Sequence, residues 1–333
     1  ASALAAGCPV VVKAHPSHPG VCELIGGAIV AALDRVGLPP GVFSLVYGGA
    51  DEGARLVRHS AIAAVGFTGS VRAGRALAEL ASARPRPIPV MAEMSSVNPV
   101  LVLPGALAAR PAEIAAGLAA SVTLGVGQFC TNPGLVLLPP GEGAAVETFV
   151  TTLREKLVAT PAAPMLSASL RKHYVQGVRT LAAEPGVETL VAPVDDAGPG
   201  GARATAGLLR VSAEAWLASD ALRHEVFGPA TLLVTDCDGP LMRRVLETLG
   251  GQLTVTLHGE PADLTSAADL LDTAERISGR VVWNGFPTGV EVSSAMVHGG
   301  PYPATTDGRF TSVGTRAIDR FLRPVCRQGF SVV

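Results

Sequence analysis

The sequence predicts an α/β protein in which strands alternate with helices and form parallel sheets. Two observations support this prediction. With 48% hydrophobic and 16% charged residues, the 333-residue chain can bury a large core, and at about 150 residues per domain its length suggests two domains. Short β-branched runs also alternate with segments in which apolar residues recur every three or four positions. Such alternation needs crossover connections, which place helices on both faces of a parallel sheet.

In the first third of the chain, the alternation predicts four strands and two helices. Residues 9–13 (PVVVK) form a short β-branched run, which is typical of a buried strand. Residues 19–37 place their apolar side chains at helical spacing, and Gly37 is a suitable helix stop. The other predicted elements are strands at residues 42–46, 61–67 and 88–94 and a helix at residues 70–83. We interpret this part as a dinucleotide-binding layer.

From Pro99 the alternation continues into a second α/β layer. Its predicted elements are strands at residues 100–103 and 135–138 and helices at residues 112–124 and 144–157. Residues 184–209 carry Pro, Gly, Asp and Ala in a looser pattern, which predicts a surface hairpin with a flexible tip. After Asn284 the chain is rich in Pro and Gly and has few helical signals.

Charge and cysteine content exclude several classes of protein. The net charge of −2 leaves no basic excess for a nucleic-acid backbone, so no nucleic-acid partner is expected. No run approaches the ~18 continuous apolar residues of a membrane span, so no membrane association is expected. The five cysteines are an odd number without a CxxC pair, which argues against a disulfide framework and structural zinc. We therefore expect a cytoplasmic protein without a metal site.

Two segments at predicted strand ends could carry chemistry. In residues 66–74 a strand ends in Gly-Phe-Thr-Gly-Ser and a helix follows at once. Unpaired N–H groups at a helix start can bind a diphosphate, but a plain strand–helix turn fits equally well. Glu93 ends an apolar strand between Ala92 and Met94. Desolvation there would raise its pKa and make it a candidate general base, whereas a solvent-facing Glu is the commoner alternative.

Cys130 lies in a polar turn, GVGQFCTNPG, and is a candidate nucleophile. Most cysteines are structural, which is the alternative here. A cysteine hydrolase would also need a histidine that activates Cys130, and the sequence singles out none. We interpret His224 and His298 as isolated structural residues.

Four segments together resemble the aldehyde dehydrogenase superfamily in order and spacing. They are FTGS at residues 67–70, AEMSSVNP at 92–99, GQFC at 127–130 and EVFGP at 225–229. Further segments are similar to the branch that oxidises α-ketoglutaric semialdehyde (2,5-dioxopentanoate) to 2-oxoglutarate, among them VVKAHPSHPG, VVWNGFPTGVEV and GGPYPATTDGRFTSVGT. The resemblance covers essentially the whole chain.

The resemblance implies that an aldehyde is oxidised to a carboxylate with NAD(P). Cys130 would attack the aldehyde to give a thiohemiacetal, and Glu93 would activate water to hydrolyse the later thioester. The implied cofactor contacts are Lys13 at the adenosine ribose, Ser70 at a phosphate with Gly69 beside it, Thr68 and Phe227 at the nicotinamide, and Glu225 at its ribose.

The choice between NADP and NAD depends on groups near the 2′ position of the ribose. Lys13, His15 and Ser17 could bind a 2′-phosphate, whereas Asp51 and Glu52 in the loop YGGADEGAR would oppose one, with Arg55 to offset them. The resembling branch usually prefers NADP. NADP is therefore the expected cofactor, with NAD as the alternative.

The resemblance implies an α/β architecture with a Rossmann-type cofactor domain and an α/β catalytic domain. The expected boundaries are 1–98 for the cofactor domain, 99–300 for the catalytic domain and 301–333 for a segment that returns to the oligomerisation region. Members of the family are longer at the N terminus, so the cofactor domain is expected to be incomplete here. In the full-length form a homo-oligomer acting on a small aldehyde is expected.

Two alternatives stay open. A broad-specificity or long-chain aldehyde dehydrogenase is one, because Phe129, Phe286 and Pro287 suit an apolar tail, while Arg316 could either meet a carboxylate or lie on the surface. The other is an inactive fragment, because the missing part of the family includes an Asn that helps to stabilise the oxyanion, and losing one such donor costs on the order of 10²–10³ in rate.

Overall fold

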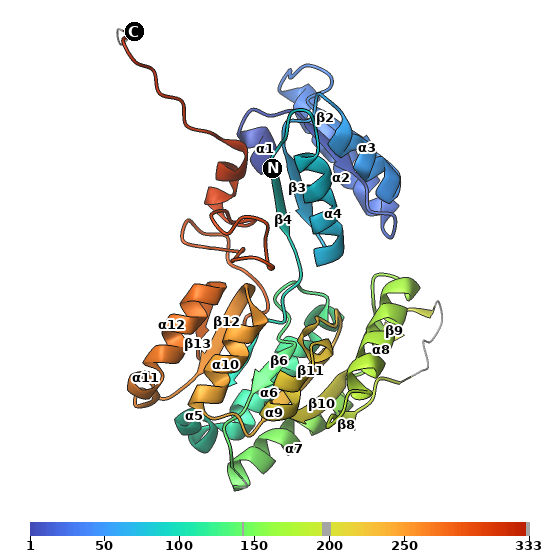
Figure 1. Ribbon diagram of the computed structural model, residues 1–333. Coiled ribbons are helices and arrows are strands. Elements are labelled where there is room, and N and C mark those ends of the chain that lie inside the picture. Colours follow the sequence, from blue (N-terminus) through green and yellow to red (C-terminus); the bar gives the residue numbers. More distant parts are fainter. Residues whose placement is uncertain (142, 195–200, 331–333) are drawn as a thin grey trace.

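The computed structural model describes residues 1–141, 143–194 and 201–330, which form two stacked parts (Figure 1). The upper part in that view contains four short strands, and β1 pairs with β2 and β3 with β4, both in parallel. Its elements are α1 (Ser2–Ala5), β1 (Val10–Lys13), α2 (Pro19–Arg35), β2 (Phe43–Val46), α3 (Ala50–Arg58), β3 (Val65–Thr68), α4 (Val71–Ser82) and β4 (Val90–Glu93).

All four strands predicted for this part form, but the expectation of a buried first strand is wrong. In β1 the side chains of Val11 and Val12 are 43% and 37% exposed. The strand pairs only with β2 among the described residues, so its apolar side chains are not covered on both faces. The expected single layer is likewise divided into two pairs of strands.

Local interactions explain where helix α4 begins and how it packs against β4. Ser70 precedes α4, and its side chain accepts a hydrogen bond from the N–H of Ala73 at 3.3 Å, which satisfies a free donor of the first turn. Gly74 lets the helix approach β4, because a Cβ there would lie 2.6 Å from the sulfur of Met94. The start of α4 is thereby held beside the ends of β3 and β4.

The lower part is built on a seven-stranded sheet in the order β13-β12-β5-β6-β11-β10-β8. All neighbours are parallel except the edge strand β8, which is antiparallel to β10. The strands are β5 (Val100–Val102), β6 (Leu135–Leu137), β8 (Glu188–Val191), β10 (Gly207–Ser212), β11 (Ala230–Thr235), β12 (Gln252–His258) and β13 (Ser278–Trp283). A separate short pair joins β7 (Ala163–Pro164) and β9 (Arg203–Ala204).

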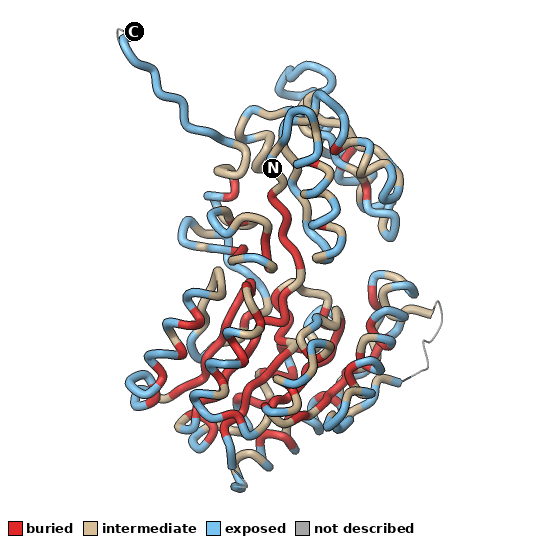
Figure 2. Tube along the Cα trace, in the orientation of Figure 1, coloured by how far each residue is buried: buried red, intermediate tan, exposed pale blue. Residues whose placement is uncertain are grey.

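Helices cover both faces of this sheet, and its central strands are buried throughout (Figure 2). Side chains that alternate along the strands form one core with α5 (Pro104–Ala109), α6 (Pro111–Thr123) and α7 (Ala144–Ala159). On the other face they form a second core with α8 (Ala168–Ala182), α9 (Ala213–Ala218), α10 (Gly239–Leu249) and α12 (Ala268–Ile277), which follows the short α11 (Asp263–Ser266). This arrangement confirms the predicted α/β class.

The expected hairpin at residues 184–209 corresponds to the antiparallel pair β8–β10, and its tip at 195–200 lies outside the described residues. The sequence does not predict α3, α5, β7, α8 or the strands and helices that follow residue 209. No helix in the described ranges is long and apolar enough to cross a membrane.

The last segment of the chain returns from the lower part to the upper part (Figure 1). It runs as a loop after β13, as the sequence predicts, and includes the 3₁₀ helix η4 (Thr315–Phe321). The N–H of Met94 donates to the carbonyl of Ala304 at 2.7 Å, and the N–H of Thr306 donates to the carbonyl of Ala92 at 3.0 Å. The end of β4 is therefore enclosed by residues more than 200 positions away.

Candidate active site

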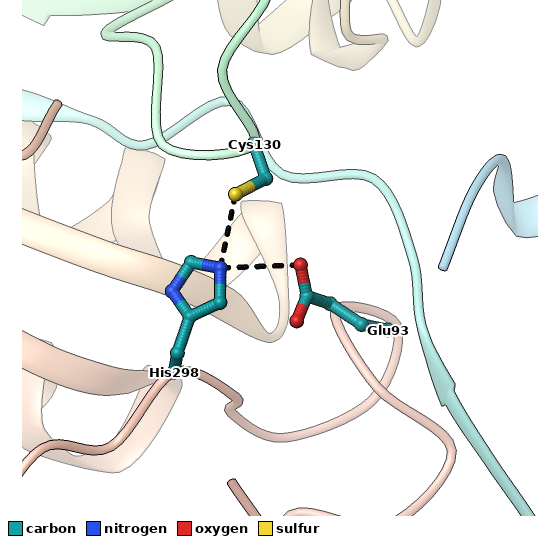
Figure 3. Close-up of side chains that lie close together, drawn as sticks. All are labelled: Glu93, Cys130 and His298. Carbon is teal, nitrogen blue, oxygen red and sulfur yellow. Dashed lines mark hydrogen bonds and ion pairs between the residues drawn. The ribbon is translucent and has the colours of Figure 1, made fainter. Parts of the chain in front are cut away.

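Three side chains from distant parts of the chain meet where the upper and lower parts join (Figure 3). The Nε2 atom of His298 lies 2.9 Å from the sulfur of Cys130 and 3.2 Å from Oε1 of Glu93. The side chains of His298 and Glu93 are only 4% and 6% exposed. One imidazole nitrogen thus contacts both a cysteine sulfur and a carboxylate.

The pairing of β3 with β4 places Glu93 at this point. Thr68 and Glu93 are partners in the parallel register, so both strands end at the same edge. The N–H of Gly69 then donates to the carbonyl of Glu93 at 3.0 Å. The solvent-facing alternative for Glu93 is wrong, because the returning C-terminal segment covers its side chain.

The Cys130 loop follows α6 and the 3₁₀ turn η1 (Leu124–Gly127), and buried amides hold it in place. The side-chain N–H₂ of Asn98 donates to the carbonyls of Cys130 and Asn132 at 2.9 and 3.0 Å. Asn132 in turn donates to the carbonyl of Gly228 at 3.1 Å. Gly127 has a φ of +66°, and a Cβ there would lie 2.2 Å from the backbone of Gly228, so a glycine is required. The Cys130 loop is thereby hydrogen-bonded to the EVFGP motif.

The C-terminal segment supplies the remaining contacts. The N–H of His298 donates to Oγ1 of Thr311 at 2.8 Å, and the N–H of Ser312 donates to the carbonyl of His298 at 2.8 Å. The hydroxyl of Ser312 donates a short hydrogen bond to Oε2 of Glu93. Each carboxylate oxygen of Glu93 therefore faces a donor.

Hydrogen bonds and charge oppose the effect of burial at both His298 and Glu93. Burial alone would lower the pKa of His298, but its hydrogen bonds to Cys130 and Glu93 and the negative charge of Glu93 raise that pKa to about 9. Burial alone would raise the pKa of Glu93, but hydrogen bonds and charge from His298, with hydrogen bonds from Ser312 and Cys130, lower it overall. The expected net rise in the pKa of Glu93 does not occur, because these hydrogen bonds and the charge of His298 outweigh desolvation.

His298 and Ser312 are the residues that sequence reasoning missed. His298 was interpreted as isolated, yet it touches Cys130 across 168 positions of sequence. No local pattern marks either residue, since each reaches Cys130 or Glu93 only through the return of the chain to β4. The nearest signal is the segment GGPYPATTDGRFTSVGT, which begins at the residue after His298 and includes Ser312.

A cleft of about 930 Å³ separates α4 from the lower part, and Ser70, Arg72, Arg75 and Glu225 line it. It combines the N-terminal end of a helix, two cations and a carboxylate, which are groups that bind a diphosphate and a ribose. Burial raises the pKa of Glu225 to about 7, with an opposing hydrogen bond from Ser95. The expected cofactor residues Ser70 and Glu225 thus share one cleft, and the residues present fit a dinucleotide.

Other expected cofactor residues lie in or next to this region. Thr68 and Gly69 are exposed between the end of β3 and the start of α4. Phe227 lines a small cavity together with Glu225.

The expected 2′-phosphate contacts lie at the end of β1. The Nζ atom of Lys13 donates to the carbonyls of Ala14 and Gly48 at 3.0 and 3.2 Å. His15 Nδ1 accepts the N–H of Ser17 at 3.2 Å, and both residues are exposed.

The acidic residues of the neighbouring loop differ in position. Glu52 accepts a hydrogen bond from the N–H of Gly49 at 2.7 Å, so its carboxylate caps α3. Asp51 is exposed in the first turn of the same helix.

Phe286 and Arg316, which were considered as contacts for the far end of the substrate, lie in different parts of the structure. The ring of Phe286 packs against His258, with 4.8 Å between centroids, and joins the core beside α6. Arg316 is 72% exposed and pairs with Asp319 at 3.3 Å on η4, which fits the surface alternative. Arg316 therefore has a carboxylate partner within the chain.

Comparisons with known proteins identify the family of the chain. A model described as "Aldehyde dehydrogenase family" matches residues 1–236. Alpha-ketoglutaric semialdehyde dehydrogenase 2 of Azospirillum brasilense is 53% identical over 331 residues, which is 99% of this chain and 62% of that protein. Alpha-ketoglutaric semialdehyde dehydrogenase of Acinetobacter baylyi is 46% identical over 333 residues, which is 100% of this chain and 62% of that protein.

The chain therefore spans about three fifths of the length of these curated relatives. Among solved structures, glyceraldehyde-3-phosphate dehydrogenase of Methanocaldococcus jannaschii, complexed with NADP, has a TM-score of 0.77 at 19% identity, over 96% of this chain and 66% of that one. A proline utilization A mutant of Bradyrhizobium japonicum has a TM-score of 0.78 at 24% identity, over 96% of this chain and 32% of that one. These likenesses concern the fold. His298 and Ser312 lie beyond the residues that the family model matches.

Proposed function

The chain belongs to the aldehyde dehydrogenase family, and from this premise we propose that it oxidises 2,5-dioxopentanoate to 2-oxoglutarate with NAD(P). The position of His298 between Cys130 and Glu93 carries the proposal, since its Nε2 atom contacts both the sulfur and the carboxylate. The substrate is taken from the printed names of the two relatives at 53% and 46% identity.

Cys130 acts as the nucleophile in this proposal. A protonated His298 beside the sulfur stabilises the thiolate, which is the reactive form of cysteine. The second nitrogen of His298, Nδ1, is buried without a hydrogen-bond partner among the described residues, which costs the imidazolium about 1–3 kcal/mol. The two anionic partners at Nε2 oppose this cost. Attack forms the S–C bond of a thiohemiacetal on Cys130.

The thioester on Cys130 is then hydrolysed. When bound, the nicotinamide supplies the acceptor for the hydride that leaves the thiohemiacetal. Glu93 takes the proton of the attacking water, and the S–C bond breaks to return the Cys130 thiolate. The acid product ionises, and its proton and the proton held by Glu93 pass to solvent. The imidazolium of His298 pairs with that thiolate, so the resting state is restored. Ser312 keeps one oxygen of Glu93 occupied and leaves the other directed toward His298.

NADP is the proposed cofactor, and the family uses NAD or NADP. Lys13, His15 and Ser17 lie together at the end of β1 and could meet a 2′-phosphate. The bond to the N–H of Gly49 holds the carboxylate of Glu52 at the start of α3, where its negative charge opposes a 2′-phosphate, so the choice rests on Lys13, His15 and Ser17. For the rest of the cofactor, the proposed contacts are Ser70 and Gly69 at a phosphate, Thr68 and Phe227 at the nicotinamide, and Glu225 at its ribose.

Domain limits of 1–98, 99–300 and 301–333 are part of the proposal. The start of the seven-stranded sheet at Val100 supports the first boundary. A contact of the last segment with a second copy is supported by the exposed side chains of Leu322, Val325 and Phe330. A cytoplasmic location is supported by the five cysteines, all of which are free thiols.

A cysteine hydrolase is the second candidate, because the contact between His298 and Cys130 supplies the activating histidine that such an enzyme needs. Only hydride transfer separates the two, so reduced-nicotinamide absorbance should be followed with 2,5-dioxopentanoate. NADP and NAD are compared, with hexanal as the long-chain control substrate and Cys130→Ala as the control protein. Turnover that is faster with 2,5-dioxopentanoate and absent in Cys130→Ala is expected. Acid release without reduced nicotinamide would support the hydrolase instead.

A further inference from the structure

The cluster of Cys130, His298 and Glu93 has the donor atoms of a zinc site. Within the described part of the chain, these are the three Cys, His and acidic residues whose ligand atoms all lie within 4.8 Å of one another. A thiolate, an imidazole nitrogen and a carboxylate oxygen are the three ligand types that Zn²⁺ takes in proteins. Hard cations such as Mg²⁺ and Ca²⁺ prefer oxygen ligands and would make little use of the sulfur.

The spacing of these atoms suits a small tetrahedral ion. Zinc–ligand bonds of about 2.0–2.3 Å place neighbouring ligand atoms about 3.4–3.6 Å apart. The sulfur of Cys130 lies 2.9 Å from Nε2 of His298, which lies 3.2 Å from Oε1 of Glu93. The sulfur and Nε2 would have to separate slightly for zinc to enter, and the sulfur and the carboxylate oxygen lie within 4.8 Å of each other. The fourth position would be left for water.

The surroundings of the ligands set the strength of binding. Ser312 bonds the far oxygen of Glu93, which is the type of outer contact that orients a metal-binding carboxylate. Nδ1 of His298 has no such partner among the described residues. Since structural zinc ligands usually donate this second N–H, the site suits a reversibly bound ion more than a permanent one.

We propose that Cys130, His298 and Glu93 bind one Zn²⁺ reversibly, and that the bound ion blocks the nucleophile. The ion forms bonds to sulfur, nitrogen and oxygen and displaces the proton that Cys130 and His298 share, which passes to solvent. No electron is transferred. Binding is independent of the proposed function, and only the inhibition of turnover rests on it.

The test is the rate at which iodoacetamide alkylates each cysteine, read by mass spectrometry without substrate or cofactor. Zn²⁺ is expected to slow alkylation of Cys130 by about tenfold or more, EDTA to restore it, and Mg²⁺ to leave it unchanged. Cys326 is exposed and serves as the internal reference. Titration calorimetry of the same protein should give one ion per chain.

Single-ligand variants show which residues hold the ion. Glu93→Gln and His298→Asn should each weaken zinc binding by about tenfold or more, measured by calorimetry on protein whose melting is unchanged. The matched control is His18→Asn, because His18 and Cys22 form the other cysteine–histidine contact, at 3.3 Å. Zinc affinity that is lost in His18→Asn and kept in both ligand variants would overturn the proposal.

Failure of this proposal can be told apart from failure of the proposed function. A protein that turns over 2,5-dioxopentanoate but keeps fast Cys130 alkylation in Zn²⁺ contradicts the metal site alone. A protein that gives no reduced nicotinamide, yet shows zinc protection of Cys130, contradicts the oxidation and supports the metal site.

Discussion

Residues 1–89 and the seven-stranded sheet of the lower part follow the same alternation of strand and helix but bury their apolar side chains very differently. Before β4, the buried hydrophobic residues are Ala14, Val57 and Ala81. On α2 the side chains of Leu24 and Ile25 are 76% and 58% exposed. In the lower part, every residue of β5, β6 and β12 is buried (Figure 2).

The difference shows that an apolar pattern predicts the type of an element but not its burial. In the lower part, helices cover both faces of a broad sheet, so each strand gains neighbours on all sides. In the upper part, each strand has one partner among the described residues, and the apolar face of α2 stays exposed. Substitutions in the two parts test whether catalysis depends on their junction and whether stability depends on the buried core of the lower part.

The largest expected effect concerns catalysis at the junction of the two parts. His298→Asn should reduce kcat/KM for the aldehyde by about 10²–10⁴, because the thiolate loses its charged partner. Lys13→Ala, in the upper part, should instead raise mainly the KM for the cofactor. Steady-state kinetics, with the concentrations of aldehyde and cofactor both varied, measures kcat and the two KM values for each variant. Equal losses of kcat in the two variants would contradict the division of roles.

One substitution at a buried position and one at an exposed position sharpen the comparison of stability. Phe149 is fully buried on α7, so Phe149→Ala should lower the free energy of unfolding by about 3–5 kcal/mol. Val21 is 58% exposed on α2, so Val21→Ala should change it by less than about 0.5 kcal/mol. Urea unfolding gives both values. A large cost for Val21→Ala would mean that this face of α2 is covered in solution.

The pH dependence of stability provides a third test, at His258 of β12. Both ring nitrogens of His258 are buried without partners among the described residues, and burial, helped by the charge of Arg110, lowers its pKa to about 4. The unfolded chain binds this proton near pH 6.5, whereas the folded chain binds it only near pH 4. His258 therefore destabilises the fold progressively as pH falls from 6.5 toward 4, by up to about 3 kcal/mol.

His258→Leu should remove this dependence, so the variant gains stability relative to the parent as the pH falls. The comparison must be made between the two proteins, because the raised pKa of Glu225 changes stability in the opposite sense over part of this range. Urea unfolding at several pH values measures the difference. A constant difference between pH 7 and pH 4 would show that His258 is not buried in its neutral form.

A smaller effect on turnover is expected at Ser312, whose hydroxyl donates a hydrogen bond to Glu93 and not to Cys130. Ser312→Ala should lower kcat by about tenfold, since a hydrogen bond to a charged group is lost, while the alkylation rate of Cys130 stays nearly constant. Ser312→Thr should recover most of the activity, and Ser294→Ala, exposed in the same segment, is the control. A parallel fall in turnover and alkylation would indicate a merely structural role.

Local signals were sufficient for most elements of the first half of the chain. Periodicity predicted β5, β6, α6 and α7, whereas the resemblance to the aldehyde dehydrogenase superfamily pointed to Cys130 and Glu93. The exposed faces of β1 and α2 could not be foreseen, because burial depends on which elements cover them. His298 could not be assigned either, because its role depends on the return of residues 298–312 to β4.

The most direct test compares the iodoacetamide reactivity of all five cysteines at neutral pH, in the parent protein and in His298→Asn. Cys326 is exposed, whereas burial and the charges of Asp238 and Asp236 raise the pKa of Cys237 to about 12. If His298 stabilises a thiolate, Cys130 is alkylated fastest despite its partial burial, and His298→Asn removes that advantage. If Cys326 reacts fastest in both proteins, Cys130 and His298 do not form one reactive unit.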